Sequence, residues 1–110
     1  MPPNLPESDW KTLSRLKPLA LDRLCQRIFQ ESESIIARAK EGEKHHAYLD
    51  LYKHIHASDE TVADCFNDWK RSQAIIILAN WRSNDLLTEE EFSVFSSETR
   101  AMVEVLLKQR

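Results

Sequence analysis

The chain has little of the two residue types that make tight turns. It contains one glycine, Gly42, among 110 residues, and its four prolines all lie within the first 18 positions. Because hairpins and tight turns depend on glycine and proline, the sequence from Leu19 onward favours long helices over a β-rich fold. The scarcity of glycine also excludes phosphate-cradling loops, dinucleotide-binding fingerprints and nucleophile elbows, and with them the known loop-based ATP, NAD and serine-hydrolase chemistries.

Cysteines and long apolar runs are scarce as well. The two cysteines, Cys25 and Cys65, stand 40 positions apart, and the first ten residues show neither a basic start nor an apolar run. We therefore expect no disulfide framework and a cytoplasmic location. The longest apolar run, Ala74–Ala79, has six residues, whereas a membrane-spanning helix needs about 20. We expect no membrane association.

The charge is unevenly distributed but does not form a basic patch. Residues 1–40 carry seven Lys or Arg and five acids, and residues 41–110 carry eight and thirteen, so the two parts are +2 and −5. A nucleic-acid-binding protein normally shows a concentrated basic stripe. The short pairs Lys11 with Arg15 and Arg23 with Arg27 do not make one, and we do not expect nucleic acid as a partner.

Hydrophobic periodicity predicts an all-α protein with four or five helices in a compact, bundle-like single domain. Residues 1–7 are expected to be a flexible Pro-rich arm, and residues 8–110 the helical domain. The predicted core is Leu24, Ile28, Ile35, Leu51, Ile55, Phe66, Trp69, Ile76, Phe92, Phe95, Met102 and Leu106.

Local signals predict the helix boundaries. Pro18 predicts a break near Lys17, and Gly42 predicts a left-handed stop after the first long helix. A second helix holds the histidines and ends or bends near Ser58, whose hydroxyl would cap a third helix running to about Arg82. The pair Thr88 and Glu91 forms a capping-box signature. A final helix follows, which residues 96–98 could split in two.

All four histidines lie within residues 45–56, which raises the question of a metal site. One helix presents two ligands to one ion only at a spacing of about three or four residues, and no two histidines here have that spacing. With Tyr48, Leu51, Tyr52 and Ile55 taken as the core side, His45 and His56 should flank the core, while His46 and His54 should face solvent.

One partial metal motif remains. Glu43 and His46 have the Glu-x-x-His spacing that di-iron bundles use, although such sites need two of these motifs and two further glutamates. Dimerisation could duplicate the motif. A metal-dependent helical enzyme assembled across a dimer is therefore the alternative functional hypothesis, with Glu43 and His46 as its metal ligands.

The segment "AIIILA" at Ala74–Ala79 is apolar around the full circumference of its helix. Either this helix is central in the domain, or a second chain covers part of it. We favour the second explanation, with Ile75, Ile76, Leu78 and Trp81 as interface candidates. The principal hypothesis is a non-enzymatic protein–protein interaction or homodimerisation module without a cofactor, whose partner is a second copy or another protein.

Overall fold

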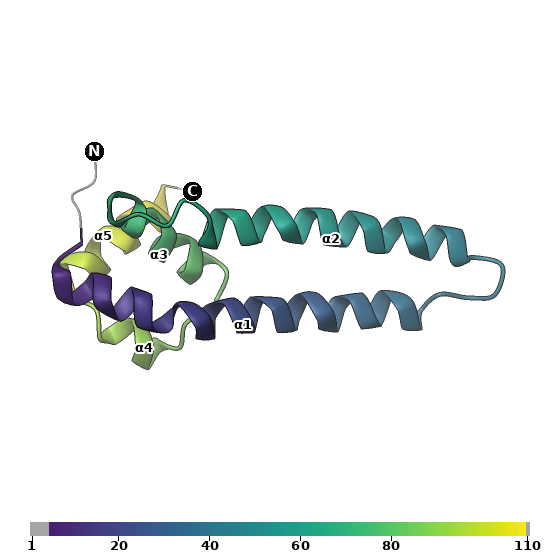
Figure 1. The fold of residues 1–110 in the computed structure, drawn as a ribbon, viewed down its shortest axis with the longest axis horizontal. Coiled ribbons are helices and arrows are strands. Elements are labelled where there is room, and N and C mark those ends of the chain that lie inside the picture. The colour runs from purple at the N-terminus through teal and green to yellow at the C-terminus, as the bar shows by residue number, and fades with distance from the viewer. Residues whose placement is uncertain (1–4, 110) are drawn as a thin grey trace.

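The computed structural model describes residues 5–109, which form five α-helices and one short 3-10 helix, with no strand in that range. A hairpin of two long helices projects from a compact head of three shorter helices (Figure 1), and the molecule measures 55 × 26 × 23 Å. The all-α fold class is confirmed. The elements are α1 (Glu7–Ala37), α2 (Lys44–Phe66), the 3-10 helix η1 (Arg71–Gln73), α3 (Ala74–Ser83), α4 (Glu89–Ser93) and α5 (Ser97–Lys108).

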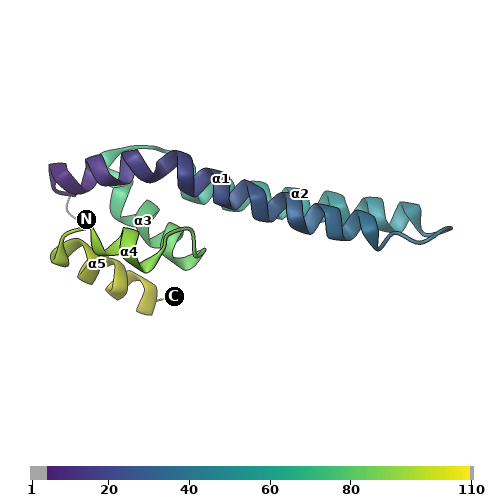
Figure 2. The ribbon, with the colours of Figure 1, turned by 90° about the horizontal axis from the view of Figure 1, so that it is seen from below.

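Helix α1 is continuous over 31 residues, so the predicted break near Lys17 is wrong. Pro18 lies inside the helix, where a proline costs about 3 kcal/mol or more. A buried stripe runs past it on the opposite side, including Leu13, Ala20 and Leu24. Because each fully buried leucine contributes roughly 1.5–3 kcal/mol, packing along this stripe outweighs the cost of the proline. The helix bends between its head-side half and its hairpin half (Figure 2) instead of ending.

Helices α1 and α2 pack side by side and antiparallel along the hairpin (Figures 1 and 2). Nε2 of His54 lies 3.0 Å from the carbonyl oxygen of Ile28, and Nδ1 of the same ring lies 3.5 Å from the hydroxyl of Ser58. His54 therefore faces α1 and is half-buried, which corrects the expectation that it faces solvent. Gly42 adopts φ 82 in the connecting turn, but α1 already ends at Ala37, so this glycine shapes the turn and not the helix end.

Helix α2 continues through Ser58 to Phe66, so the predicted boundary at Ser58 is also wrong. The hydroxyl of Ser58 lies near His54 and does not cap a new helix. The chain breaks instead at Asp68, whose φ of 55 is left-handed. Helix α3 then begins at Ala74 and is a separate element from α2.

The head is built around α3 and a cluster of aromatic rings. Trp81 is fully buried, and its indole N–H donates to the carbonyl oxygen of Cys65 at 2.8 Å. Its ring lies 5.5 Å from Phe66 and 6.0 Å from Trp69, which in turn lies 5.5 Å from Trp10. All three tryptophans of the chain therefore belong to one cluster that joins α1, α3 and the end of α2.

Two capped helix starts complete the head. The predicted capping box is confirmed, because Thr88 and Glu91 exchange both side-chain to backbone hydrogen bonds. Ser96 caps α5, so the last helical segment is split in two, as the sequence allowed. The carboxylate of Asp9, which is 3% exposed, accepts hydrogen bonds from Ser96 N at 3.0 Å, Ser96 Oγ at 2.7 Å and Thr99 Oγ1 at 2.7 Å. This buried acid fastens the start of α1 to the start of α5.

Residues 5–7 of the predicted arm are ordered parts of the fold. Leu5 is buried in the core, its carbonyl oxygen accepts two hydrogen bonds from Arg71, and α1 begins at Glu7. Residues 1–4 of that prediction lie outside the described residues.

A second joint ties α1 to α4. Arg23 binds the carboxylate of Glu91 with its two terminal nitrogens, at 2.6 and 3.0 Å, and also donates to the carbonyl oxygen of Leu86 at 2.8 Å. The hydrogen bonds from Arg23 lower the pKa of Glu91 to about 2. One turn along α1, Arg27 donates to the carbonyl oxygens of Asn84 and Asp85. The head is therefore held rigidly against one flank of α1.

Candidate interaction surface

The apolar segment in α3 is covered by the chain itself. Ile75, Leu78 and Trp81 are 2%, 0% and 0% exposed, so three of the four predicted interface residues are core residues. Helices α1, α2 and α5 all pack against α3. The structure thus favours the first of the two explanations for this segment, that its helix is central. Ile76 is the exception at 37% exposed, and its predicted core position is also wrong.

In helix α2 the prediction is wrong in the opposite direction, because the side that was predicted to be core is exposed. Tyr48, Tyr52 and Ile55 are 62%, 61% and 45% exposed, and Leu51 is only half-buried. The side that packs on α1 instead includes His54 and small or polar residues such as Ala47 and Ser58. Side chains of this size let the two helices approach closely and leave the larger ones on the free side.

A hollow beneath the hairpin shows which flank of each helix faces the head. It is lined by Arg27 of α1, Thr61 of α2 and Asn84 of the head, among others. At about 100° per residue, Phe29 and Ile36 lie roughly opposite Arg27 on α1, and Tyr52 lies roughly opposite Thr61 on α2. These large side chains therefore share the side of the hairpin that faces away from the head.

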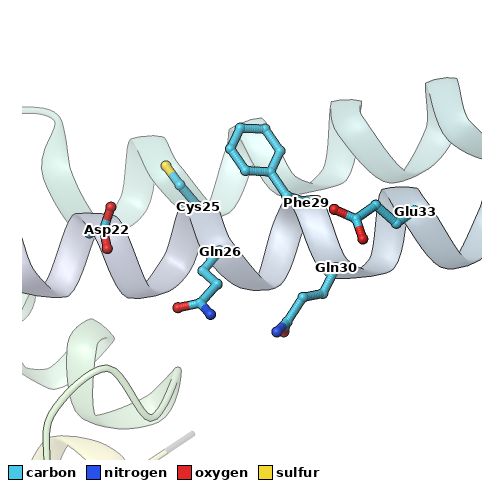
Figure 3. A pocket seen from close by; sticks show the side chains of 6 residues that line it. All are labelled: Asp22, Cys25, Gln26, Phe29, Gln30 and Glu33. Atoms are coloured by element: carbon cyan, nitrogen blue, oxygen red, sulfur yellow. The ribbon is translucent and has the colours of Figure 1, made fainter.

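We call this side the outer face. It presents large side chains from both helices, with exposures of 64% for Phe29 and 60% for Ile36 besides the three α2 residues above. Figure 3 shows Phe29 and Cys25 pointing away from the head, whereas Gln26 and Gln30 point toward the side on which the head lies. The outer face is defined by Phe29, Ile36, Tyr48, Tyr52 and Ile55.

Histidines extend the aromatic surface of α2 at both ends. The His45 ring stacks on Tyr48 with centroids 6.3 Å apart, and the His56 ring stacks on Tyr52 at 6.1 Å. His45 and His56 are exposed and flank the tyrosine stripe, as expected, but that stripe is a free surface and not a core. The sequence carried this signal, because ring stacks at three- and four-residue spacing belong to one helix face.

The candidate metal ligands do not converge into a site. Glu43 and His46 line one small hollow with Asp50, on the head side of the hairpin. His46 Nε2 lies 3.4 Å from Asp50 Oδ2, and both side chains are largely exposed. Within residues 5–109, no three His, Cys, Asp or Glu side chains form a group that could hold a metal ion. Nothing in this arrangement favours the metal-dependent alternative.

A second, smaller apolar surface lies on the head. Helices α3 and α5 form a groove lined by Ile75, Ala101, Met102, Val105, Leu106 and Gln109. Val105 is 54% exposed, so this groove is open to solvent. It has fewer large exposed side chains than the outer face and no aromatic ring.

The comparisons with protein-family models, curated protein sequences and solved structures return no match for this chain. In the part of the chain that the structure describes, no helix combines the length and apolar character needed to cross a bilayer.

Proposed function

We propose that the protein is a non-enzymatic protein–protein interaction module that docks through the outer face of its helical hairpin. The observation that carries the proposal is the exposure of five large apolar or aromatic side chains on one side of one hairpin. Contiguous apolar surface of this kind on a soluble protein is characteristic of an interaction site. Tyrosine and phenylalanine are also the side chains enriched at interface centres.

The hairpin is suited to this role because it is held at one end only. The head packs against α1 as far as Arg27 and against the end of α2. Beyond Arg27, α1 runs alongside α2 and away from the head (Figures 1 and 2). The outer-face side chains are 45–64% exposed, whereas Ile35 is buried and His54 contacts the carbonyl oxygen of Ile28 across the two helices. These side chains can therefore contact a partner without unfolding or rearranging the hairpin.

Photo-cross-linking in cells that produce the protein tests the proposal. A photoreactive phenylalanine analogue at Tyr52 should give one adduct of defined mass, identified by mass spectrometry, and Phe29→Glu in the same chain should abolish it. The matched control is the analogue at Val94, which is 58% exposed on the head and should give no adduct. Equal labelling from both positions, or none from Tyr52, would overturn the proposal.

A further inference from the structure

We propose that the outer face binds a second copy of this chain, turned end over end about a two-fold axis, so that two hairpins form an antiparallel four-helix bundle. This inference rests on the proposed function and specifies its partner. It follows from the positions of the exposed side chains along the two helices and from the charges at the two ends of the face.

The apolar side chains are placed symmetrically about one level of the hairpin. The contact between His54 and Ile28 fixes the alignment of the two antiparallel helices. It puts the midpoint between Phe29 and Ile36 on α1 within about one residue, or 1.5 Å, of the level of Asp50 on α2. Tyr48 and Tyr52 lie two positions to either side of Asp50.

A two-fold axis that crosses the hairpin at this level, at right angles to the helices, therefore brings most of these apolar side chains against apolar side chains of the other copy. It also brings Glu33, four residues after Phe29, near Glu33 of the other copy. Phe29 of one copy lies opposite Ile36 of the other, and Tyr48 lies opposite Tyr52. The same operation places His45 opposite Ile55, since these residues stand five positions to either side of Asp50. Such an arrangement, in which each patch meets its own copy, is the defining property of a two-fold interface.

The charges at the ends of the face select this axis over one that runs along the hairpin. Near the head, Asp22 stands seven residues before Phe29, and Asp59 stands four residues after Ile55, so both extend the outer face. At the distal tip, Lys44 stands four residues before Tyr48 and donates to the carbonyl oxygen of Ala39 at 2.9 Å, and the adjoining turn holds Lys40 and Glu41. Asp22 and Asp59 thus make the head end acidic, whereas residues 38–44 at the tip carry three cations, Arg38, Lys40 and Lys44, against two acids, Glu41 and Glu43.

End-over-end pairing places the acidic end of each copy over the lysine end of the other. A two-fold axis parallel to the hairpin would instead pair residues at the same height along the two hairpins. It would therefore bring Asp22 of one copy beside Asp59 of the other. Like charges in contact cost binding free energy, and complementary charges direct the alignment of two chains. The end-over-end bundle also leaves both heads on the outside, since each head lies on the opposite side of its own hairpin.

The available area matches that of a weak or transient pair. Aromatic side chains each bury about 150–250 Å² when fully enclosed. The outer face, with its aromatic residues about 60% exposed, therefore offers roughly 500 Å² of side-chain surface per copy. Two copies would bury about 1,000 Å² before backbone and rim atoms are counted, which is close to the lower bound of specific interfaces.

Sedimentation equilibrium over a wide concentration range is the first test. The wild-type protein should be a dimer, and Tyr52→Glu should raise its dissociation constant by about 100-fold or more, because the introduced charge would be buried without a partner. Val94→Glu is the matched control and should leave the dissociation constant unchanged. Circular dichroism should show that both variants keep the helical content of the wild type.

Charge reversal tests the orientation. Asp59→Lys and Lys44→Asp should each weaken the dimer by about tenfold. The double variant with both changes should recover most of the wild-type affinity, because the pairs across the axis are restored with opposite sign. Absence of recovery would overturn the end-over-end arrangement.

Disulfide trapping provides an independent result in a background where Cys25 is replaced by Ser and Cys65 by Ala. A mixture of Tyr48→Cys and Tyr52→Cys chains should form the mixed disulfide dimer. A mixture of Phe29→Cys and Tyr52→Cys chains should not, because only an axis along the hairpin brings those positions level. The reverse pattern would overturn the inference while leaving the proposed function intact.

The outcomes separate the two proposals. A strictly monomeric wild type that still gives a specific Tyr52 photo-adduct with a different protein would overturn self-association but support the interaction module. A monomer with no adduct would overturn both.

Discussion

The head and the distal hairpin carry the same kinds of large side chain but bury them to opposite degrees. Phe92 and Phe95 in the head are 6% and 1% exposed, whereas Phe29 in the hairpin is 64% exposed. The difference lies in the number of neighbours. Helix α3 is covered by α1, α2 and α5, but the part of α1 beyond Arg27 and the facing part of α2 have only each other as neighbours and can bury only one side. Apolar residues on the remaining sides therefore stay exposed to solvent.

Truncation of a large aromatic side chain should show the largest difference in stability loss between the head and the hairpin. Trp81→Ala should reduce the free energy of unfolding by about 3–5 kcal/mol, since it opens a cavity and removes the hydrogen bond to Cys65. Phe29→Ala should change the free energy of unfolding of the monomer by no more than about 0.5 kcal/mol. Urea unfolding at low protein concentration measures both. A comparable loss in both variants would show that the outer face is part of the folding core.

Removal of the buried carboxylate of Asp9 should cause the second-largest loss of stability. Asp9→Ala removes an acceptor that receives three hydrogen bonds from Ser96 and Thr99. Leaving these donors unpaired should cost about 2–3 kcal/mol. Asp22→Ala, on the same helix but exposed on the hairpin, is the control and should be nearly neutral in the monomer. Thermal unfolding of both variants checks the difference.

Acidification should weaken the joint between the head and α1 in a defined pH range. Arg23 lowers the pKa of Glu91 from 4.5 to about 2. The folded state therefore favours the charged carboxylate, and this contribution is complete above about pH 4.5 and is lost as the pH falls toward about 2. Glu91→Gln should be less stable than wild type by about 1–2 kcal/mol at neutral pH, and the gap should close across that range.

Urea titrations from pH 7 to pH 2 measure the gap between wild type and Glu91→Gln. Glu90→Gln, on the exposed side of α4, is the matched control and should be close to wild type at neutral pH. A gap for Glu91→Gln that is constant across the pH range would rule out the ion pair as its source.

Substitutions at the left-handed residues of two connecting turns should change the free energy of unfolding least, and in opposite directions. Gly42 in the hairpin turn has φ 82 with open space around its Cα, so Gly42→Ala should cost about 1 kcal/mol through backbone strain alone. Asp85 in the head has φ 56, which glycine adopts without steric cost. Asp85→Gly should therefore raise the free energy of unfolding by roughly 0.5 kcal/mol. Calorimetry of each variant distinguishes the signs, and a loss in Asp85→Gly would indicate that its side chain supports the turn.

Local signals in the sequence predicted part of this architecture well. The capping box at Thr88 and Glu91 and the helix start at Ser96 depend on neighbours three residues away, and both are confirmed. Other local signals gave wrong predictions because distant packing overrides them. Pro18 marks a helix break in isolation, and Ser58 marks a helix start, but the long stripes buried in α1 and the contact between His54 and Ile28 overrule them.

The prediction of the candidate site followed the same division. The sequence identified an excess of apolar surface but assigned it to Ile75, Leu78 and Trp81, which are core residues. The pattern of Tyr48, Tyr52 and Ile55 predicts a core, because an amphipathic helix has the same pattern whether its apolar side is covered or free. The exposure of Phe29 and Ile36 on the side away from the head could not be predicted without the position of the head.

Composition and short-range patterning were sufficient to specify a helical protein without glycine-dependent loops, because those features depend on the backbone preferences of single residues and their nearest neighbours. The fold class, the capped starts of α4 and α5, and the amphipathic stripes all belong to this group. The assignment of each stripe to the core or to the surface required the packing of the whole chain. A stripe is buried only where enough other helices surround it, and the head surrounds α3 but leaves the distal hairpin covered on one side.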